Sequence, residues 1–248
     1  MTGPTPIDVI GIVIPVRNEQ ELLPRCLLAL SAALEAVSGE LMFDRPRIDV
    51  VIVLTRCTDA SASIAARWPE FSCITSDSAA IGTARRSGVR HVLAGLPTEP
   101  QSALERVWIA TTDADAAVPA NWLTTQLAYA RNGTELVMGT VHSAGVPSLE
   151  GAGGFSIQRS LRDGHPFVHS VNLGVRADRY LAAGEFTELD GDEDLALAQC
   201  LRDRQVIEAR TALIPVLAAG RLNGRSPAEM ERYLRLHRGD FQPDANPA

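Results

Sequence analysis

The sequence predicts an α/β fold in which a mostly parallel, Rossmann-like sheet is flanked by helices. Short apolar segments rich in Val and Ile alternate along the chain with segments whose apolar residues repeat at helical spacing. The strand-like segments are almost continuously apolar, as is typical of strands buried on both faces of a parallel sheet. This order implies right-handed βαβ units, with ligands bound at the carboxyl ends of the strands.

Most of the alternation lies in the part of the chain before residue 142. The apolar run at 7–14 stops at Pro15, and the helical spacing that follows closes at Gly39. Thr58 and Asp59 are favourable cap residues for a helix that Pro69 would end. The expected strands are 7–14, 48–54, 71–75, 107–111 and 136–141, and the expected helices are 19–37, 58–68, 83–93 and 121–131.

The pattern changes after residue 141. Four glycines and a proline between 145 and 154 predict a loop. The elements expected beyond it are a partly helical segment at 173–183, a helix at 192–204 that opens with three acids, a strand at 206–209 and a last helix at 227–236. The tail, 241–248, is expected to fray.

The composition argues against several classes of protein. A formal charge of −7 and a pI near 5.3 oppose a nucleic-acid surface, which concentrates Lys and Arg. The four cysteines form no Cys-x-x-Cys pair, so a disulfide frame or structural zinc site is not expected. No basic region precedes an apolar run at the start of the sequence, and no segment is long and apolar enough to cross a membrane. We therefore expect a soluble, cytoplasmic protein.

Two carboxylates on alternate residues follow the expected strand at 107–111. If the chain stays extended, Asp113 and Asp115 point the same way, about 6–7 Å apart. Two like charges held together need a cation or a proton between them. The alternative interpretation is a solvated turn with an Asx cap.

Four short motifs occur in order along the chain. They are Val13-Ile-Pro-Val-Arg-Asn-Glu19, Asp113-Ala-Asp115, Asn172-Leu-Gly-Val-Arg176 and Gly191-Asp-Glu-Asp-Leu195. Together they resemble the motifs of family 2 glycosyltransferases, over roughly residues 7–205. The resemblance implies a GT-A fold and an enzyme that moves a sugar, usually with inversion, from a nucleoside-diphosphate sugar to a hydroxyl acceptor.

The resemblance also implies a metal site. Asp115 takes the position of the usual metal contact, and Asp113 that of a group near the ribose or the water of the metal. Mg²⁺ and Mn²⁺ favour one or two carboxylates, with phosphate oxygens and water in the remaining positions. A divalent cation there would offset the charge that develops on the diphosphate leaving group. The implied cofactor is therefore Mg²⁺ or Mn²⁺.

Pro15, Arg17 and Glu19 fall where the family holds the nucleotide base. Alternatively, Pro15 ends the strand, and Asn18 or Glu19 caps the next helix. Many relatives place an acid directly after the second strand to bind uracil, whereas here Leu54 is followed by four other residues before Asp59. We therefore expect a donor selectivity that is not strictly that of a uracil site.

A further stretch, Ile81-Gly-Thr-Ala-Arg-Arg-Ser-Gly88, resembles the family segment that lies beside the nucleotide. The resemblance implies that Gly82 lets the backbone approach the nucleotide and that Arg85, rather than Arg86, reaches toward it. Helix N-termini attract phosphate, and a guanidinium adds a forked donor. The alternative is a helix start with one surface arginine.

The acids at 192–194 are candidates for the catalytic base. Inverting transfer needs a base to take the proton of the acceptor hydroxyl. Aligning Leu195 with the end of the family motif places the base at Asp192, with Asp194 in reserve. Because acids at a helix start also favour the helix dipole, simple capping remains the alternative.

The resemblance divides the chain into a donor half, 1–142, and an acceptor half, 143–248, within one continuous domain. The expected partners are a nucleoside-diphosphate sugar and a small or lipid-linked acceptor, with a homodimer left open and no nucleic acid. His169 is a candidate for the acceptor border, with an ordinary structural role as the alternative. The basic stretch Arg221-Leu-Asn-Gly-Arg225 either folds over the diphosphate or forms a solvated loop.

Three other functions are alternatives to glycosyl transfer. A nucleotidyltransferase that makes sugar nucleotides typically has a Gly-rich loop after the first strand, and the segment 15–19 contains no glycine. A dehydrogenase would need Gly-x-Gly-x-x-Gly at that place, which is absent. A non-catalytic nucleotide-sugar binding protein of the same fold stays open, because a fold does not prove an activity.

Overall fold

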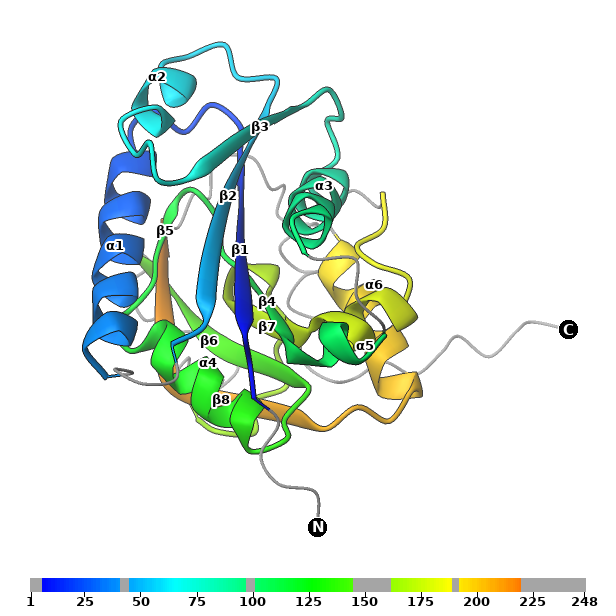
Figure 1. Ribbon diagram of the computed structural model, residues 1–248. Helices are drawn as coiled ribbons and strands as arrows, with labels where there is room; N and C mark the ends of the chain where they lie inside the picture. Colours follow the sequence, from blue (N-terminus) through cyan, green and yellow to red (C-terminus); the bar gives the residue numbers. More distant parts are fainter. Residues whose placement is uncertain (1–5, 41–44, 97–100, 145–161, 189–191, 220–248) are drawn as a thin grey trace, which may run out of the picture.

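The computed structural model describes residues 6–40, 45–96, 101–144, 162–188 and 192–219. In this part of the chain, eight strands form one sheet in the order β3-β2-β1-β4-β7-β6-β8-β5 (Figure 1). The strands are β1 (Val9–Val16), β2 (Arg47–Thr55), β3 (Ser72–Ser76), β4 (Val107–Thr111), β5 (Ala116–Ala117), β6 (Leu136–Ala144), β7 (Leu173–Arg176) and β8 (Glu208–Ala219). The helices are α1 (Leu23–Glu40), α2 (Ser61–Ala65), α3 (Ile81–Ala94), α4 (Trp122–Arg131), α5 (Ala177–Ala182) and α6 (Glu193–Asp203), with 3-10 turns η1 (Gln101–Arg106) and η3 (Ser170–Asn172).

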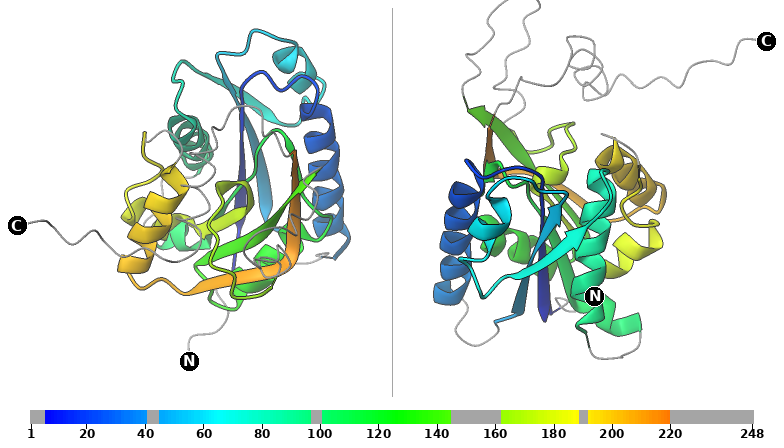
Figure 2. Two further views of the ribbon diagram at one scale, coloured as in Figure 1. Left: turned by 180° about the vertical axis from the view of Figure 1, so that it is seen from behind. Right: turned by 90° about the horizontal axis from the view of Figure 1, so that it is seen from above.

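The half of the sheet formed by β3, β2, β1 and β4 is parallel throughout. Successive side chains of β1 enter two separate cores, because side chains alternate between the faces of a strand. Ile12 and Ile14 pack with residues of α1 and α4, whereas Val13 packs with residues of α3 and α6. Helices therefore cover both faces of the sheet, as Figure 2 shows. The expected fold class, a mostly parallel α/β sheet flanked by helices, is confirmed.

The other half of the sheet is mixed, and here the sequence-based expectations were incomplete. The segment 173–183 begins with the strand β7, which is antiparallel to both β4 and β6, before α5 follows. The strand expected at 206–209 is β8, which extends to Ala219 and pairs with β6 and β5. These strands are defined by partners far away in the sequence, so local spacing does not reveal them.

Two helices have other bounds than expected. The helix expected from residue 19 is α1, which begins at Leu23 after a turn at residues 20–22. The amides of Glu19 and Gln20 donate to the side chains of Ser61 and Asp59, at 2.8 and 3.0 Å. The helix expected at 58–68 is α2, which spans only residues 61–65. The loop at 145–154, the helix at 227–236 and the tail lie outside the described residues.

The fold brings two helix starts to the edge of the sheet where β1, β2 and β4 end, which we call the carboxyl edge. A Cβ atom placed on Gly82, in the first turn of α3, would lie 3.1 Å from Cβ of Glu193, in the first turn of α6. The opposite edge, where β2 and β3 begin, is called the amino edge. No helix within the described ranges combines the length and the apolar character needed to span a bilayer.

Candidate functional site

Asp113 and Asp115 lie at the carboxyl edge, directly after β4. The extended geometry expected for them does not persist, because residues 114 and 115 form a turn. The amide of Ala116 donates to the carbonyl of Asp113 at 3.1 Å, and the amide of Ala219 donates to the carbonyl of Asp115 at the same distance. Ala114 is buried while both acids are partly exposed. The two carboxylates therefore remain accessible on either side of a buried residue.

Arg85 joins this turn to the start of α6. Its side chain is 1% exposed, and its Nη2 lies 2.5 Å from Oδ1 of Asp113. Its Nη1 donates to Oε1 of Glu193, whose side chain is 5% exposed. The guanidinium carbon also lies 5.8 Å from the centre of the Phe186 ring. One buried guanidinium thus bridges two carboxylates that are far apart in the sequence.

The charges in this bridge affect one another. Burial alone would lower the pKa of Arg85, but Asp113 and Glu193 raise it, and the net direction is upward. Burial raises the pKa of Glu193, Arg85 opposes that rise, and Asp194 and Asp113 add to it, so that the net direction is again upward. The guanidinium therefore stays charged, and Glu193 is a weaker acid than an exposed glutamate.

Asp192 and Asp194, on either side of Glu193, have different surroundings. The side chain of Asp192 is half-buried and makes no capping hydrogen bond to α6. Oδ2 of Asp194 accepts from the amide of Ser170 at 3.1 Å, and Oδ1 accepts from the amide of Leu195 at 2.8 Å. The capping alternative thus receives no support from Asp192, whereas Asp194 fastens α6 to the segment that leads into β7.

Sequence reasoning did not single out Glu193, although it marked the acids on both sides. A signal was present in the spacing, because Glu193 shares a helical stripe with Leu197 and Leu201, both of which are buried. An acid at the first position of a buried stripe is unusual, since carboxylates are rarely buried without a partner. The partner, Arg85, could not be identified from that spacing.

The loop after β1 is fastened to the loop after β2. Pro15 lies within β1 and does not end it. A proline has no amide hydrogen to give to a neighbouring strand, but β1 pairs with β4 only as far as Val13, so Pro15 lies beyond that pairing. Arg17 is exposed, and Glu19 is half-buried. The neighbouring Asn18, at φ 54°, accepts the amide hydrogen of Thr58 at 2.8 Å. The assignment of Pro15, Arg17 and Glu19 to the nucleotide base stays a prediction.

Gly82 permits a close approach within the chain itself. A Cβ atom on this residue would lie 2.0 Å from the carbonyl oxygen of Thr187, a distance that no side chain can occupy. The absence of Cβ therefore allows α3 to pack against the segment before α6 and places Arg85 within reach of Glu193. A contact between Gly82 and a nucleotide stays a prediction.

Asn172, the first residue of the motif Asn172-Leu-Gly-Val-Arg176, is buried and joins other elements through the hydrogen bonds of its side chain. Its Oδ1 accepts from Nε1 of Trp122 at 2.9 Å, and its Nδ2 donates to the carbonyls of Thr140 at 2.9 Å and Ile214 at 2.7 Å. These bonds join α4, β6 and β8 behind the carboxyl edge. His169 lies three residues earlier, half-buried, with its ring stacked on Phe167 at 6.0 Å between centroids.

The carboxylates at this edge suit a hard divalent cation, although they do not complete its coordination. Within the described ranges, no group of three or more His, Cys, Asp or Glu side chains is arranged to hold a metal ion. Asp113 and Asp115 supply the one or two carboxylates that Mg²⁺ or Mn²⁺ requires when phosphate oxygens and water provide the rest. The donor set therefore fits a cation that binds together with a phosphate ligand. The stretch Arg221 to Arg225 lies outside the described residues.

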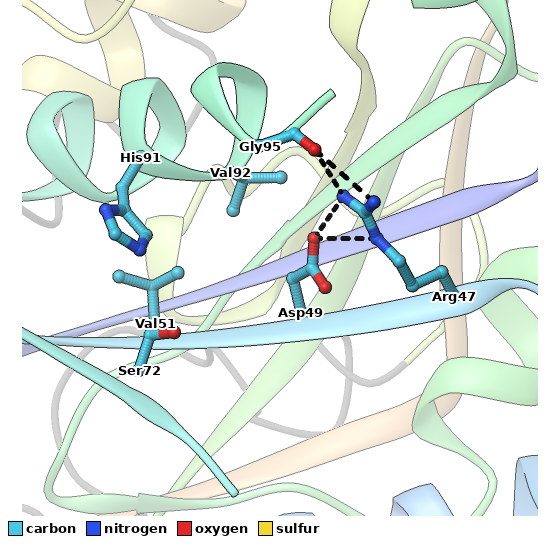
Figure 3. A pocket seen from close by; sticks show the side chains of 7 residues that line it. All are labelled: Arg47, Asp49, Val51, Ser72, His91, Val92 and Gly95. Atoms are coloured by element: carbon cyan, nitrogen blue, oxygen red, sulfur yellow. Dashed lines mark hydrogen bonds and ion pairs between the residues drawn. The ribbon is translucent and has the colours of Figure 1, made fainter. Parts of the chain in front are cut away.

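A polar pocket of about 270 Å³ lies at the amino edge, away from these residues (Figure 3). Arg47 and Asp49 form an ion pair at 2.6 Å across it, and Arg47 also donates to the carbonyl of Gly95 at 3.4 Å. His91 and Ser72 complete its rim. None of the residues singled out from the sequence lines this pocket.

Comparison with known proteins gives a family match and a set of similar structures. Residues 11–176 match the family model for Glycosyl transferase family 2. The mannosyltransferase PcManGT from Pyrobaculum calidifontis, solved with GDP-Man and Mn²⁺, aligns with a TM-score of 0.64 at 17% identity, covering 95% of this chain and 63% of that one. S. aureus TarS 1-349 aligns with a TM-score of 0.58 at 14% identity, covering 93% and 64%.

GalNAc-T7, solved with UDP, GalNAc and Mn²⁺, aligns with a TM-score of 0.62 at 13% identity, covering 93% of this chain and 47% of that one. The chain thus spans less than two thirds of the length of these proteins. No curated protein sequence matches it. At these identities the structural likeness shows the fold alone, which is the GT-A fold that the sequence motifs implied.

Proposed function

The chain belongs to glycosyl transferase family 2, and from this premise we propose that it transfers a sugar from a nucleoside-diphosphate sugar to a hydroxyl group of an acceptor. One observation carries the proposal. The carboxyl edge gathers Asp113 and Asp115 from the end of β4, the buried Arg85 from α3 and the acids at the start of α6. Ligands of open α/β sheets bind at this edge.

In the proposal, Asp115 holds a divalent cation, Mg²⁺ or Mn²⁺, and Asp113 assists it. When bound, the cation supplies positive charge to the diphosphate leaving group. The fit of two hard oxygen ligands supports this role, as do the Mn²⁺ ions in the complexes of PcManGT and GalNAc-T7. Arg85 contacts Asp113 as well, with its Nη2 2.5 Å from Oδ1 of that acid.

The nucleotide base is assigned to the loop after β1. Arg17 and Glu19 stand in that loop, which is tied to the segment after β2. In that segment the nearest acid, Asp59, already accepts the amides of Gln20 and Ser61, at 3.0 and 2.9 Å. Asp59 therefore serves the loop structure, and we propose that the donor base is not selected as strictly as in a uracil site.

The acceptor hydroxyl is assigned to the second half of the chain, 143–248, with the donor in the first half, 1–142. Asp192 is proposed as the general base. Both carboxylate oxygens of Asp194 accept backbone amides, which favours an anchoring role for that acid. Asp192 lies half-buried at the N-cap position of α6, beside Glu193, and its carboxylate is of the kind that can take a proton from a hydroxyl group. The acceptor is proposed to be a small or lipid-linked molecule.

Calorimetry with UDP, GDP and TDP, each with Mn²⁺ or with EDTA, tests the proposal. We expect at least one nucleoside diphosphate to bind with Mn²⁺ and to bind more weakly in EDTA, and the corresponding sugar nucleotide to release its diphosphate on addition of acceptor. Equal affinity in both conditions would contradict the metal role, and no binding at all would contradict the function. A UDP preference of a hundredfold, about 2.7 kcal/mol, would contradict the relaxed base selectivity.

A further inference from the structure

Three ion pairs join α3 to the segment that leads into α6, and they differ in burial. The pairs are Arg85–Glu193, Arg86–Glu188 and Arg90–Glu185. The side chain of Glu188 is 72% exposed and that of Arg90 is 63% exposed, so the two outer pairs are solvated. The pair of Arg85 and Glu193 is buried on both sides. The outer pairs also connect α3 to this segment, so the burial of the inner pair needs a reason of its own.

The inner pair is not arranged for the greatest stability. Nε of Arg85 and Oε2 of Glu193 are buried without a hydrogen-bond partner among the described residues, as are the hydroxyls of Thr83 and Thr187. A buried ion pair with unsatisfied polar atoms loses more on desolvation than a well-packed apolar pair would. Its contribution to the molecule is therefore better sought in what it positions.

What the pair positions is Asp113. The guanidinium of Arg85 gives one nitrogen to Asp113 and the other to Glu193, so its charge is divided between two carboxylates. A cation bound at the end of β4 would compete with the guanidinium of Arg85 for the carboxylate of Asp113, since either positive group stabilises that anion. The contact between Glu193 and Arg85 thus weakens the electrostatic attraction between Arg85 and Asp113.

We propose that Glu193 is a positioning residue for the metal site, and that it acts through Arg85. By holding one side of the guanidinium, Glu193 keeps Arg85 from pairing fully with Asp113 and leaves that carboxylate available to a divalent cation. The proposal rests on the proposed function in placing the cation at Asp113 and Asp115. It also links the start of α6, which carries Asp192, to the donor side of the site.

The test is the affinity for Mn²⁺, measured by calorimetry on the full chain, both with Mn²⁺ alone and with UDP, GDP or TDP present. Glu193→Gln keeps the shape and one acceptor oxygen but removes the charge, so Asp113 becomes the one carboxylate that Arg85 contacts among the described ion pairs. We expect Mn²⁺ to bind on the order of tenfold more weakly. Glu188→Gln is the matched control, because Glu188 joins the same two segments through the neighbouring Arg86, and its Mn²⁺ affinity should equal that of the wild type.

A double-mutant cycle separates this route from a direct effect of the Glu193 charge. In an Asp113→Asn background there is no carboxylate for Arg85 to withhold, so Glu193→Gln should no longer change the Mn²⁺ affinity. An undiminished effect in that background would overturn the proposal, as would a Glu193→Gln protein that binds Mn²⁺ like the wild type. A wild type that binds no Mn²⁺, with or without nucleoside diphosphate, would refute the metal role in the proposed function, on which this inference rests.

A second variant covers the case in which Glu193→Gln fails to fold. Combining it with Arg85→Gln removes both buried charges, which is tolerated far better than removing one. Asp113 then has no guanidinium partner, so Mn²⁺ should bind at least as tightly as in the wild type. Weaker binding to this double variant would also overturn the proposal. Thermal unfolding in EDTA confirms that each variant is folded before the metal is added.

Discussion

The two edges of the sheet carry nearly the same ion pair in different surroundings. At the amino edge, Arg47 and Asp49 lie 2.6 Å apart, and at the carboxyl edge Arg85 and Asp113 lie 2.5 Å apart. The acids are equally exposed, at 31% and 30%, but Arg47 is 45% exposed and Arg85 only 1%. Contact distance therefore does not distinguish a solvated pair from one with a buried guanidinium. The difference lies in whether the guanidinium has water as an alternative partner.

Replacing the two arginines by methionine should give the largest contrast between the edges. Arg85→Met leaves Glu193 buried without its counterion, and we expect a loss of about 3–5 kcal/mol in the free energy of unfolding. Arg47→Met removes a solvated pair and should cost at most about 1 kcal/mol. Urea unfolding without nucleotide measures both values. Equal losses would show that burial does not set the difference between the edges.

The second contrast concerns turnover. Asp192→Asn at the carboxyl edge keeps the shape but removes the basic oxygen, and we expect turnover to fall about a hundredfold or more, with donor affinity nearly unchanged. Asp49→Asn at the amino edge makes the same chemical change and should leave both unchanged. Initial rates with the identified sugar nucleotide, and its dissociation constant, provide the measurement.

Two results would revise the assignment of the base. If Asp194→Asn slows transfer and Asp192→Asn does not, the base is Asp194 and the motif alignment is shifted by two residues. If neither substitution slows transfer, the acids at the start of α6 serve the helix alone.

The smallest contrast lies within the carboxyl edge, between the two acids after β4. Asp115→Ala should weaken binding of the nucleoside diphosphate in Mn²⁺ more than Asp113→Ala, by about tenfold or 1.4 kcal/mol. The reason is that Asp113→Ala also releases Arg85, whose charge then attracts the diphosphate. Titrations of both variants with and without EDTA provide the comparison. The opposite ranking would show Asp113 to be the principal metal ligand.

The parallel half of the fold was predictable from the sequence because its signals are local. The β-branched residues of β1 and the helical spacing of α1 each identify an element without knowledge of its neighbours. β7 has only four residues, Leu173–Arg176, and it is a strand because β4 and β6 flank it. A segment so short has no periodicity of its own to detect.

The candidate site divides in the same way. Asp113 and Asp115 stood out because they follow a buried strand, and that position is local information. The role of Glu193 depends on Arg85, which lies 108 residues earlier, and on the missing side chain of Gly82 that lets the two helix starts meet. An acid at a helix start is already explained by its interaction with the helix dipole, so the sequence alone does not indicate that Glu193 has a distant partner.

The interleaved strand order has a consequence for synthesis on the ribosome. β5 is translated before β6, β7 and β8, yet the strand that pairs with it, β8, is the last strand of the described sheet to be translated. The hydrogen bond from the amide of Ala219 to the carbonyl of Asp115 likewise forms only after β8 has been translated. A nascent chain that has completed β4 can assemble its parallel half, whereas the turn that carries Asp115 is secured only after about a hundred further residues have left the exit tunnel.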